Sequence, residues 1–202
     1  MMHDPHTPPP GHGSVAVSSV PASMDEVCQS LCGVVYDYWR KTKGDAFAPS
    51  WAAFDLPDLP GNCVRCIHVV DVHQDPFDIT FRFWGTGLTD VLYFDRTGQS
   101  LLSTDMGYLN EDRRTQVLAD YGTVIETRAP YPFLWDAAST GARPRRLIVP
   151  TLRLPLSDDG ARVSHVVTHF DFTDSRPIWE EMFRVAERRQ PVASPSDNDS
   201  SS

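Results

Sequence analysis

The stretch Ile79–Leu88, which reads ITFRFWGTGL, constrains the fold of this chain most. Every second residue from position 79 to 83 is Ile or Phe, the period of a strand with both faces partly covered. Gly85, Thr86 and Gly87 then end the strand, because glycine relaxes the backbone limits and the threonine hydroxyl can cap a following helix. A pocket for a small molecule is expected at this junction between a strand and a helix.

Composition narrows the classes of protein to which the chain can belong. Its 202 residues, 41% of them hydrophobic, can bury a single core of useful size, so we expect one domain with extensions. A net charge of −9 and a pI near 5.1 disfavour binding to nucleic acid or to anionic membranes. The sequence has no apolar run of membrane-spanning length and no signal peptide at its start, which predicts a cytoplasmic protein.

The two ends of the chain differ in composition from its middle. Residues 1–22 are rich in Pro, Gly, Ser and His, and residues 191–202 are rich in Ser and Asp. Both ends contain too little apolar surface to offset the entropy of ordering, so we expect disordered tails there. The predicted domain spans residues 23–176, and an amphipathic helix at 177–190 follows it.

The periodicity of the remaining segments predicts an α+β protein. The first helix is expected over Met24–Lys43, with a capping box of Ser23 and Glu26 at its start and Gly44 at its end. Further helices are expected at Leu88–Phe94, Leu101–Leu109, Glu111–Thr127 and Ile178–Arg189. Strands are expected at Cys66–Val72, Ile79–Trp84, Phe133–Asp136, Leu147–Leu156 and Val163–Phe172.

This order predicts a five-stranded antiparallel sheet with helices on one face and a flanking helix at each end. Pro150 and Pro155 remove backbone donors from their strand, so we expect that strand to be bulged or to lie partly at an edge.

Several short motifs resemble, in the same order, those of a bacterial subfamily of short, often stand-alone PAS sensor domains. The resemblance extends over about residues 30–172. The motifs are Tyr38-Trp39, Pro49-Ser50 through Phe54-Asp55, Phe81-Arg82-Phe83-Trp84-Gly85-Thr86, Asp95 with Thr97-Gly98, Tyr121 with Val124-Ile125 and Pro130, and Leu152 through Gly160, which reads LRLPLSDDG.

The resemblance implies a sensory or regulatory protein that binds a small ligand or a protein partner and signals through protein contact. A homodimer is expected. The chain has no Gly-x-Ser-x-Gly elbow, phosphate-binding loop or HExxH motif, so we do not expect an enzyme. A flavin-adduct PAS domain would have a cysteine in LLSTDMGYLNEDRR, and a haem-binding one a histidine in Glu111–Thr127; both are missing, so neither cofactor is expected.

Polar and aromatic residues of the strands and helices are the candidates for the ligand site. They are Arg82, Trp84, Tyr93, Tyr108, Tyr121, Arg153 and His169. Each aromatic residue can equally be ordinary core. The planar guanidinium of Arg82 suits a ligand carboxylate or a structural aspartate equally well.

The four cysteines suggest an alternative function. Cys28 and Cys32 lie four residues apart on one helical face, and Cys63 and Cys66 form a CxxC motif followed by His68. Four thiolates can bind zinc, and a CxxC pair can carry out thiol redox chemistry. Free cysteine is also a common core residue. A zinc-binding or thiol-redox protein therefore stays as the alternative.

Overall fold

The computed structural model of the chain describes residues 15–92, 94–102, 111–139 and 146–174. The strands are β1 (Val15–Pro21), β2 (Ile67–Gln74), β3 (Phe77–Trp84), β4 (Tyr131–Ser139), β5 (Arg146–Leu156) and β6 (His165–Phe170). The helices are α1 (Met24–Cys28), α2 (Leu31–Lys43), α3 (Gly61–Val64), α4 (Thr86–Leu92) and α5 (Glu111–Thr127), with the short 3-10 helix η1 (Leu56–Asp58). The predicted helix at 177–190, the tail at 191–202 and most of the predicted helix at Leu101–Leu109 lie outside the described residues.

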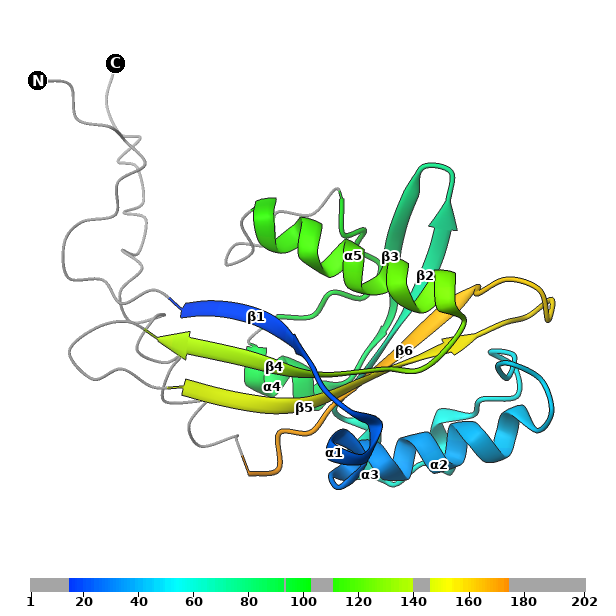
Figure 1. Cartoon of the computed structure of the whole chain (residues 1–202), viewed down its shortest axis with the longest axis horizontal. Coiled ribbons are helices and arrows are strands. Elements are labelled where there is room, and N and C mark those ends of the chain that lie inside the picture. The colour runs from blue at the N-terminus through cyan, green and yellow to red at the C-terminus, as the bar shows by residue number, and fades with distance from the viewer. Residues whose placement is uncertain (1–14, 93, 103–110, 140–145, 175–202) are drawn as a thin grey trace, which may run out of the picture.

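The six strands form one antiparallel sheet in the order β1-β4-β5-β6-β2-β3 (Figure 1). Strand β6 lies between β5 and β2, so it joins the β2–β3 pair to the β4–β5 pair. The predicted α+β class with an antiparallel sheet is confirmed.

The sheet has six strands where the sequence predicted five. The additional strand, β1, comes from the predicted tail at residues 1–22 and pairs with β4 along its whole length. The segment reads VAVSSVP, so it contains β-branched residues that favour a strand, and the edge of the sheet offers unpaired backbone groups to pair with it. The predicted boundary of the tail is corrected accordingly.

Helices cover both faces of the sheet, which corrects the prediction of a single covered face (Figure 1). Helices α4 and α5 pack on one face against residues such as Phe81 and Phe133. Helices α1, α2 and α3 pack on the other face against residues such as Leu154 and Val167. Because β5 and β6 are buried at almost every position, both of their faces need a cover.

The predicted first helix is divided in two. The side chain of Ser30 caps a second helix, so Met24–Lys43 becomes α1 and α2. The predicted cap at Ser23 is confirmed, because its hydroxyl accepts from the Glu26 N–H at 3.1 Å. Gly44, with φ of +54°, ends α2 as predicted.

A β-bulge interrupts the alternation predicted for the strand at residues 79–84. The register between β2 and β3 shifts between Val69 and Val70, which leaves Arg82 as the extra residue of β3. Trp84 therefore points to the same face as Phe81, and their rings lie 5.3 Å apart.

The two prolines of β5 do not place it at an edge, which corrects that prediction. Strand β5 lies inside the sheet and its register with both neighbours is continuous. The proline carbonyls still accept hydrogen bonds. The Asp171 N–H donates to Pro150 O at 2.9 Å, and the Trp39 indole donates to Pro155 O at 2.8 Å.

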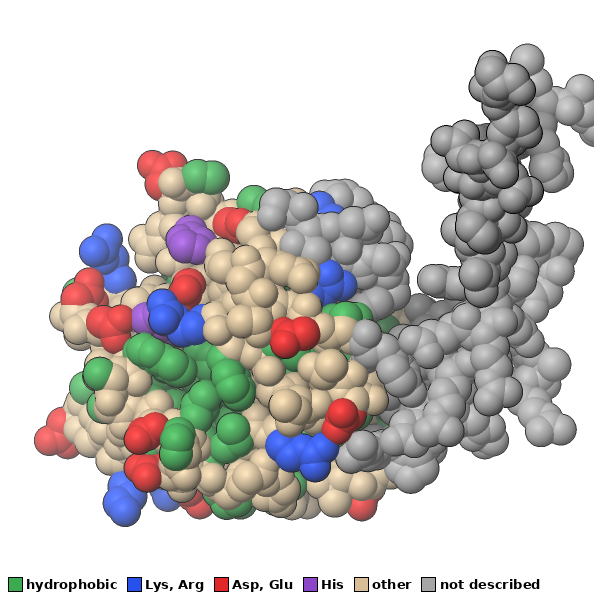
Figure 2. Space-filling view, turned by 180° about the vertical axis from the view of Figure 1, so that it is seen from behind, with side chains coloured by type: hydrophobic (Ala, Val, Ile, Leu, Met, Phe, Trp, Pro, Cys, Tyr) green, Lys and Arg blue, Asp and Glu red, His purple; other side chains and the backbone are tan. Residues whose placement is uncertain are grey.

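The surface carries acidic and basic side chains side by side, with a group of hydrophobic side chains between them on the face in Figure 2. Among the described residues, no helix combines the length and the apolar character needed to cross a membrane.

Close backbone packing explains the two glycines after β3. A Cβ atom would lie 2.4 Å from Arg65 O at Gly85 and 2.8 Å from it at Gly87, and neither glycine has a left-handed φ. The Gly85 N–H donates to Ile67 O at 2.8 Å, which fixes the junction to the start of β2. Helix α4 begins at Thr86, two residues before the predicted start at Leu88.

The variant Gly85→Ala should lower the free energy of unfolding by about 3 kcal/mol, because its methyl group would have to displace the Arg65 carbonyl. Gly122→Ala in α5 is the matched control. Its methyl group would meet nothing within 4 Å, so it should raise stability by up to about 1 kcal/mol. Urea unfolding measures both variants, and equal effects would contradict the packing explanation.

Candidate functional site

A row of polar and aromatic side chains crosses the sheet on the face that α5 covers. Residues paired directly across antiparallel strands point to the same face, and the row follows such pairs from β4 to β3. Its members, here called the polar row, are Tyr131, Arg153, Thr168, His68 and Trp84. All except Tyr131 are buried, with exposed fractions of 8% or less.

Four members of the polar row have hydrogen-bonding atoms without a partner among the described residues. These atoms are Trp84 Nε1, His68 Nδ1, Thr168 Oγ1 and Arg153 Nε. Buried polar groups in native proteins almost always have hydrogen-bond partners. A buried group without one has lost its hydrogen bonds to water and gained none in return, which lowers the stability of the fold. Four such groups in a single row therefore mark a site for something that supplies acceptors.

The charge of Arg153 is balanced by Asp120 of α5. Arg153 Nη1 lies 3.2 Å from Asp120 Oδ2, and both side chains are at most 5% exposed. The guanidinium carbon also lies over two rings, 4.3 Å from the centroid of Tyr121 and 4.6 Å from that of Phe133. Cation–π contacts of this kind stabilise a desolvated guanidinium.

Asp120 also connects the polar row to the edge strand β1. Ser19 Oγ of β1 donates to Asp120 Oδ2 at 2.8 Å, and Gln116 Nε2 donates to Oδ1 at 2.8 Å. One carboxylate therefore contacts side chains of β1, α5 and β5.

His68 is held from above by Tyr121 of α5. Its Nε2 lies 2.7 Å from the Tyr121 hydroxyl, and its ring stacks on that of Trp84 at 5.3 Å. Burial, together with the nearby charge of Arg153, lowers the pKa of His68 to about 3. The imidazole is therefore neutral at physiological pH.

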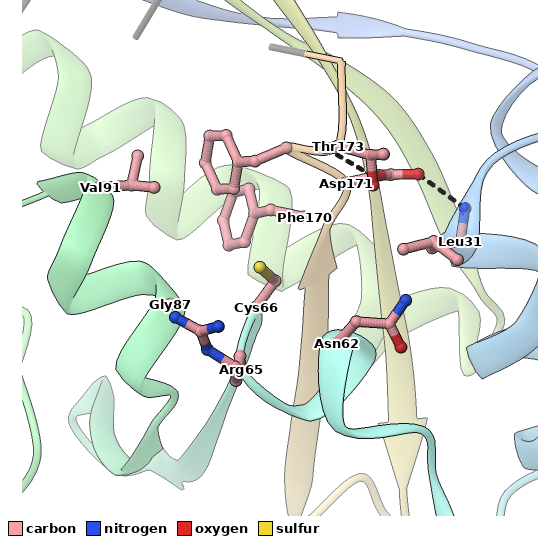
Figure 3. A pocket seen from close by; sticks show the side chains of 10 residues that line it. Leu31, Asn62, Arg65, Cys66, Gly87, Val91, Phe170, Asp171 and Thr173 are labelled. Carbon is pink, nitrogen blue, oxygen red and sulfur yellow. Dashed lines mark hydrogen bonds between the residues drawn. The ribbon is translucent and has the colours of Figure 1, made fainter. Parts of the chain in front are cut away.

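A pocket of about 230 Å³ lies where α2, α3, α4 and the end of β6 meet (Figure 3). It is lined by Leu31, Asn62, Arg65, Cys66, Gly87, Val91, Phe170, Asp171, Phe172 and Thr173. The carboxylate of Asp171 shapes one side of it by accepting from the N–H groups of Leu31 at 2.7 Å and Thr173 at 2.9 Å. Phe170 lines the pocket and also contacts the polar row, since the centroid of its ring lies 5.4 Å from that of His68.

The structure brings together three of the seven residues predicted to form the site. Trp84 and Arg153 belong to the polar row, and Tyr121 contacts both His68 and Arg153. Tyr93 and Tyr108 lie outside the described residues.

Arg82 and His169 lie away from this group. Arg82 is the exposed bulge residue, and its Nε donates to Asp71 Oδ1 at 2.5 Å, so its partner is a structural aspartate. His169 is paired with Arg153's neighbour Leu152 in the sheet and points to the opposite face, where its Nδ1 lies 3.2 Å from Cys32 Sγ.

The prediction omitted His68, Thr168 and Asp120. A signal for Asp120 was present, because Arg153 stands between two leucines and a buried guanidinium needs a counter-charge. His68 was considered only beside the cysteines. Nothing in the sequence marks Thr168, because only the register between strands places it in the row.

The four cysteines do not converge. Cys32 and Cys63 are buried with α1, α2 and α3, whereas Cys66 packs against the core on the α5 face. Helix α3 ends at Val64, between the two cysteines of the CxxC motif, and β2 begins at Ile67, directly after Cys66. Among the described residues, which include all four cysteines, no three His, Cys, Asp or Glu side chains could hold a metal ion.

The Cys32–His169 contact is a neutral pair. Burial raises the pKa of Cys32 to about 12 and lowers the pKa of His169 to about 4. A reactive thiolate needs a lowered thiol pKa, so this pair does not favour the redox alternative.

Comparisons of the chain with protein-family models, with curated proteins and with solved structures find no match.

Replacing Thr168 by Val should raise the free energy of unfolding by about 1 kcal/mol, because it removes a buried hydroxyl without a partner. Thr151→Val is the matched control. Thr151 is equally buried, but its hydroxyl donates to Val149 O at 3.0 Å. The free energy of unfolding of this variant should therefore fall by about 1 kcal/mol. Urea unfolding at pH 7 distinguishes the two variants. A lower free energy of unfolding in both would mean that the Thr168 hydroxyl has a hydrogen-bond partner.

Stability should fall as the pH drops below about 6.5, because the unfolded chain protonates His68 there and the folded chain does not. Between pH 6.5 and pH 5 this residue alone accounts for a loss of about 2 kcal/mol. In His68→Gln the difference in unfolding free energy between these two pH values should shrink by that amount, with an unchanged urea m-value. An identical difference in both proteins would show that His68 is not buried as a neutral group.

Proposed function

We propose that this protein is a sensory or regulatory module of the PAS type, not an enzyme, that binds a small ligand and signals through protein contact in the cytoplasm. The element order that carries the resemblance, two strands, helices and then three strands, recurs in β2 to β6. The antiparallel sheet with α4 and α5 on one face supports this assignment.

The observation that carries the proposal is the polar row. Four buried side chains have unused hydrogen-bonding atoms, and they lie in one line between the sheet and α5. A purely structural core would be more stable with apolar residues at these positions. Groups kept at such a cost are typical of binding sites, where the ligand supplies the missing partners.

Asp120 offers a route by which binding can be transmitted. A ligand that bonds to Arg153 changes how strongly Arg153 holds Asp120, and Asp120 also accepts from Ser19. Ser19 belongs to β1, which lies at the edge of the sheet and, among the described strands, pairs only with β4. The occupied and empty states should therefore differ in how firmly β1 is held.

The protein transmits its signal by contacting another protein, either a partner in a signalling pathway or a second copy in a homodimer. Val20 of β1 and Ile148 of β5 are large hydrophobic residues with exposed fractions of 40% and 44%. Both point to the face of the sheet opposite α5, since each lies on the same face as Leu134 or Asp136 of β4. This placement supports a contact surface next to β1.

A thermal-shift screen of the full chain against a library of water-soluble metabolites tests the proposal. A compound that binds should raise the melting temperature and slow hydrogen exchange of the β1 amides. In Ser19→Ala the same compound should still raise the melting temperature, but its effect on β1 should be lost. Ser18→Ala, one residue along on the exposed side of β1, should keep both effects.

If no compound raises the melting temperature, the protein is not a small-ligand sensor. If β1 responds equally in Ser19→Ala and Ser18→Ala, transmission does not pass through Asp120. Sedimentation velocity with and without the compound measures whether a homodimer forms.

A further inference from the structure

We infer that the ligand of the polar row is a neutral, planar ring compound that carries hydrogen-bond acceptors and no formal charge. This inference rests on the proposed function and adds the chemical class of the ligand. It follows from three properties of the row: the kind of hydrogen-bonding atoms that are unused, the balance of charge around them, and the shape of the neighbouring side chains.

The unused atoms are predominantly donors. The indole N–H of Trp84 and the Nε–H of Arg153 can only donate. When the Tyr121 hydroxyl donates to His68 Nε2, the proton of His68 is on Nδ1, which makes it a further donor. The hydroxyl of Thr168 can donate as well. A ligand that satisfies the row must therefore present acceptors such as carbonyl oxygens or ring nitrogens.

The charges around the row already cancel. Arg153 is paired with Asp120, and His68 is neutral in its buried environment. Asp120 is further satisfied by Ser19 and Gln116, so it does not call for a cationic ligand. A charged ligand would add an uncompensated charge to a buried region, which is costly. Uncharged acceptors meet the requirement without that cost.

The surrounding side chains are flat. The rings of His68 and Trp84 are parallel within 9°, and Phe81 stands edge-on to both at 5.4 Å and 5.3 Å. Aromatic walls favour a ring that stacks or packs edge-to-face. Neighbouring strands lie about 4.8 Å apart, so a ring system with acceptors at separate positions can reach donors on adjacent strands.

The pocket of Figure 3 gives the direction of approach. Phe170 lines this pocket, and its ring contacts that of His68 on the inner side. Phe170 is therefore the side chain at which the pocket and the polar row meet.

Isothermal titration of the full chain with three planar bicyclic compounds tests the inference. Caffeine is neutral and carries only acceptors, tryptamine is a cation, and indoleacetate is an anion. We expect caffeine to bind more tightly than the other two. Thr168→Val should weaken caffeine binding about fivefold, as the loss of one hydrogen bond implies, and Trp84→Phe should do the same while keeping a ring. Thr151→Val, whose hydroxyl is already bonded, should change it less than about twofold.

The inference is overturned if tryptamine or indoleacetate binds more tightly than caffeine, if caffeine does not bind at all, or if Thr168→Val and Thr151→Val weaken it equally. The last result would mean that the Thr168 hydroxyl makes no specific hydrogen bond with caffeine. Failure here is separable from failure of the proposed function. If a metabolite of another class raises the melting temperature in the screen, only the ligand class is wrong, whereas no response to any compound removes both.

Discussion

The buried ion pair between Arg153 and Asp120 is the interaction on which the rest of this structure depends. A guanidinium on an interior strand cannot reach water, so the chain must bring it an acceptor and a counter-charge. Asp120 provides both, and its position in α5 fixes where that helix lies on the sheet. The rings of Tyr121 and Phe133 on either side complete the environment of the cation. The geometry of the covered face follows from this one requirement.

The register of the strands brings further polar side chains next to this ion pair. Strand β6 joins the two strand pairs, and the registers on both of its sides place Thr168 between Arg153 and His68. The bulge at Arg82 then brings Trp84 to the same face. Polar groups from four strands meet in this way, and several of their atoms have no partner in the described part of the chain. A site of this kind lowers stability, which is the usual relation between binding sites and folded cores.

The two faces of the sheet serve different purposes. Under α5 lie charged and polar groups with unused donors. Under α1, α2 and α3 lie leucines, valines and the neutral contact of Cys32 with His169. Both groups of that contact are kept uncharged by burial, since the pKa of the thiol is raised and that of the imidazole is lowered. Cys32 and Cys63 therefore behave as core residues of the second face, and the unused polar groups lie on the first.

The sequence by itself determined the class of the fold, because local periodicity decides where helices and strands form. Helix α5, the strands β2 to β6, the cap at Ser23 and the end of α2 at Gly44 were all predictable from patterns within a few residues. The sequence also named Trp84, Tyr121 and Arg153 as candidates, and the structure places all three around His68 and the polar row. Only the tertiary structure decided that β1 joins the sheet, that helices cover both faces, and that His68, Thr168 and Asp120 complete the row. Those features depend on strand register and on backbone groups from distant parts of the chain, and neither leaves a trace in local sequence.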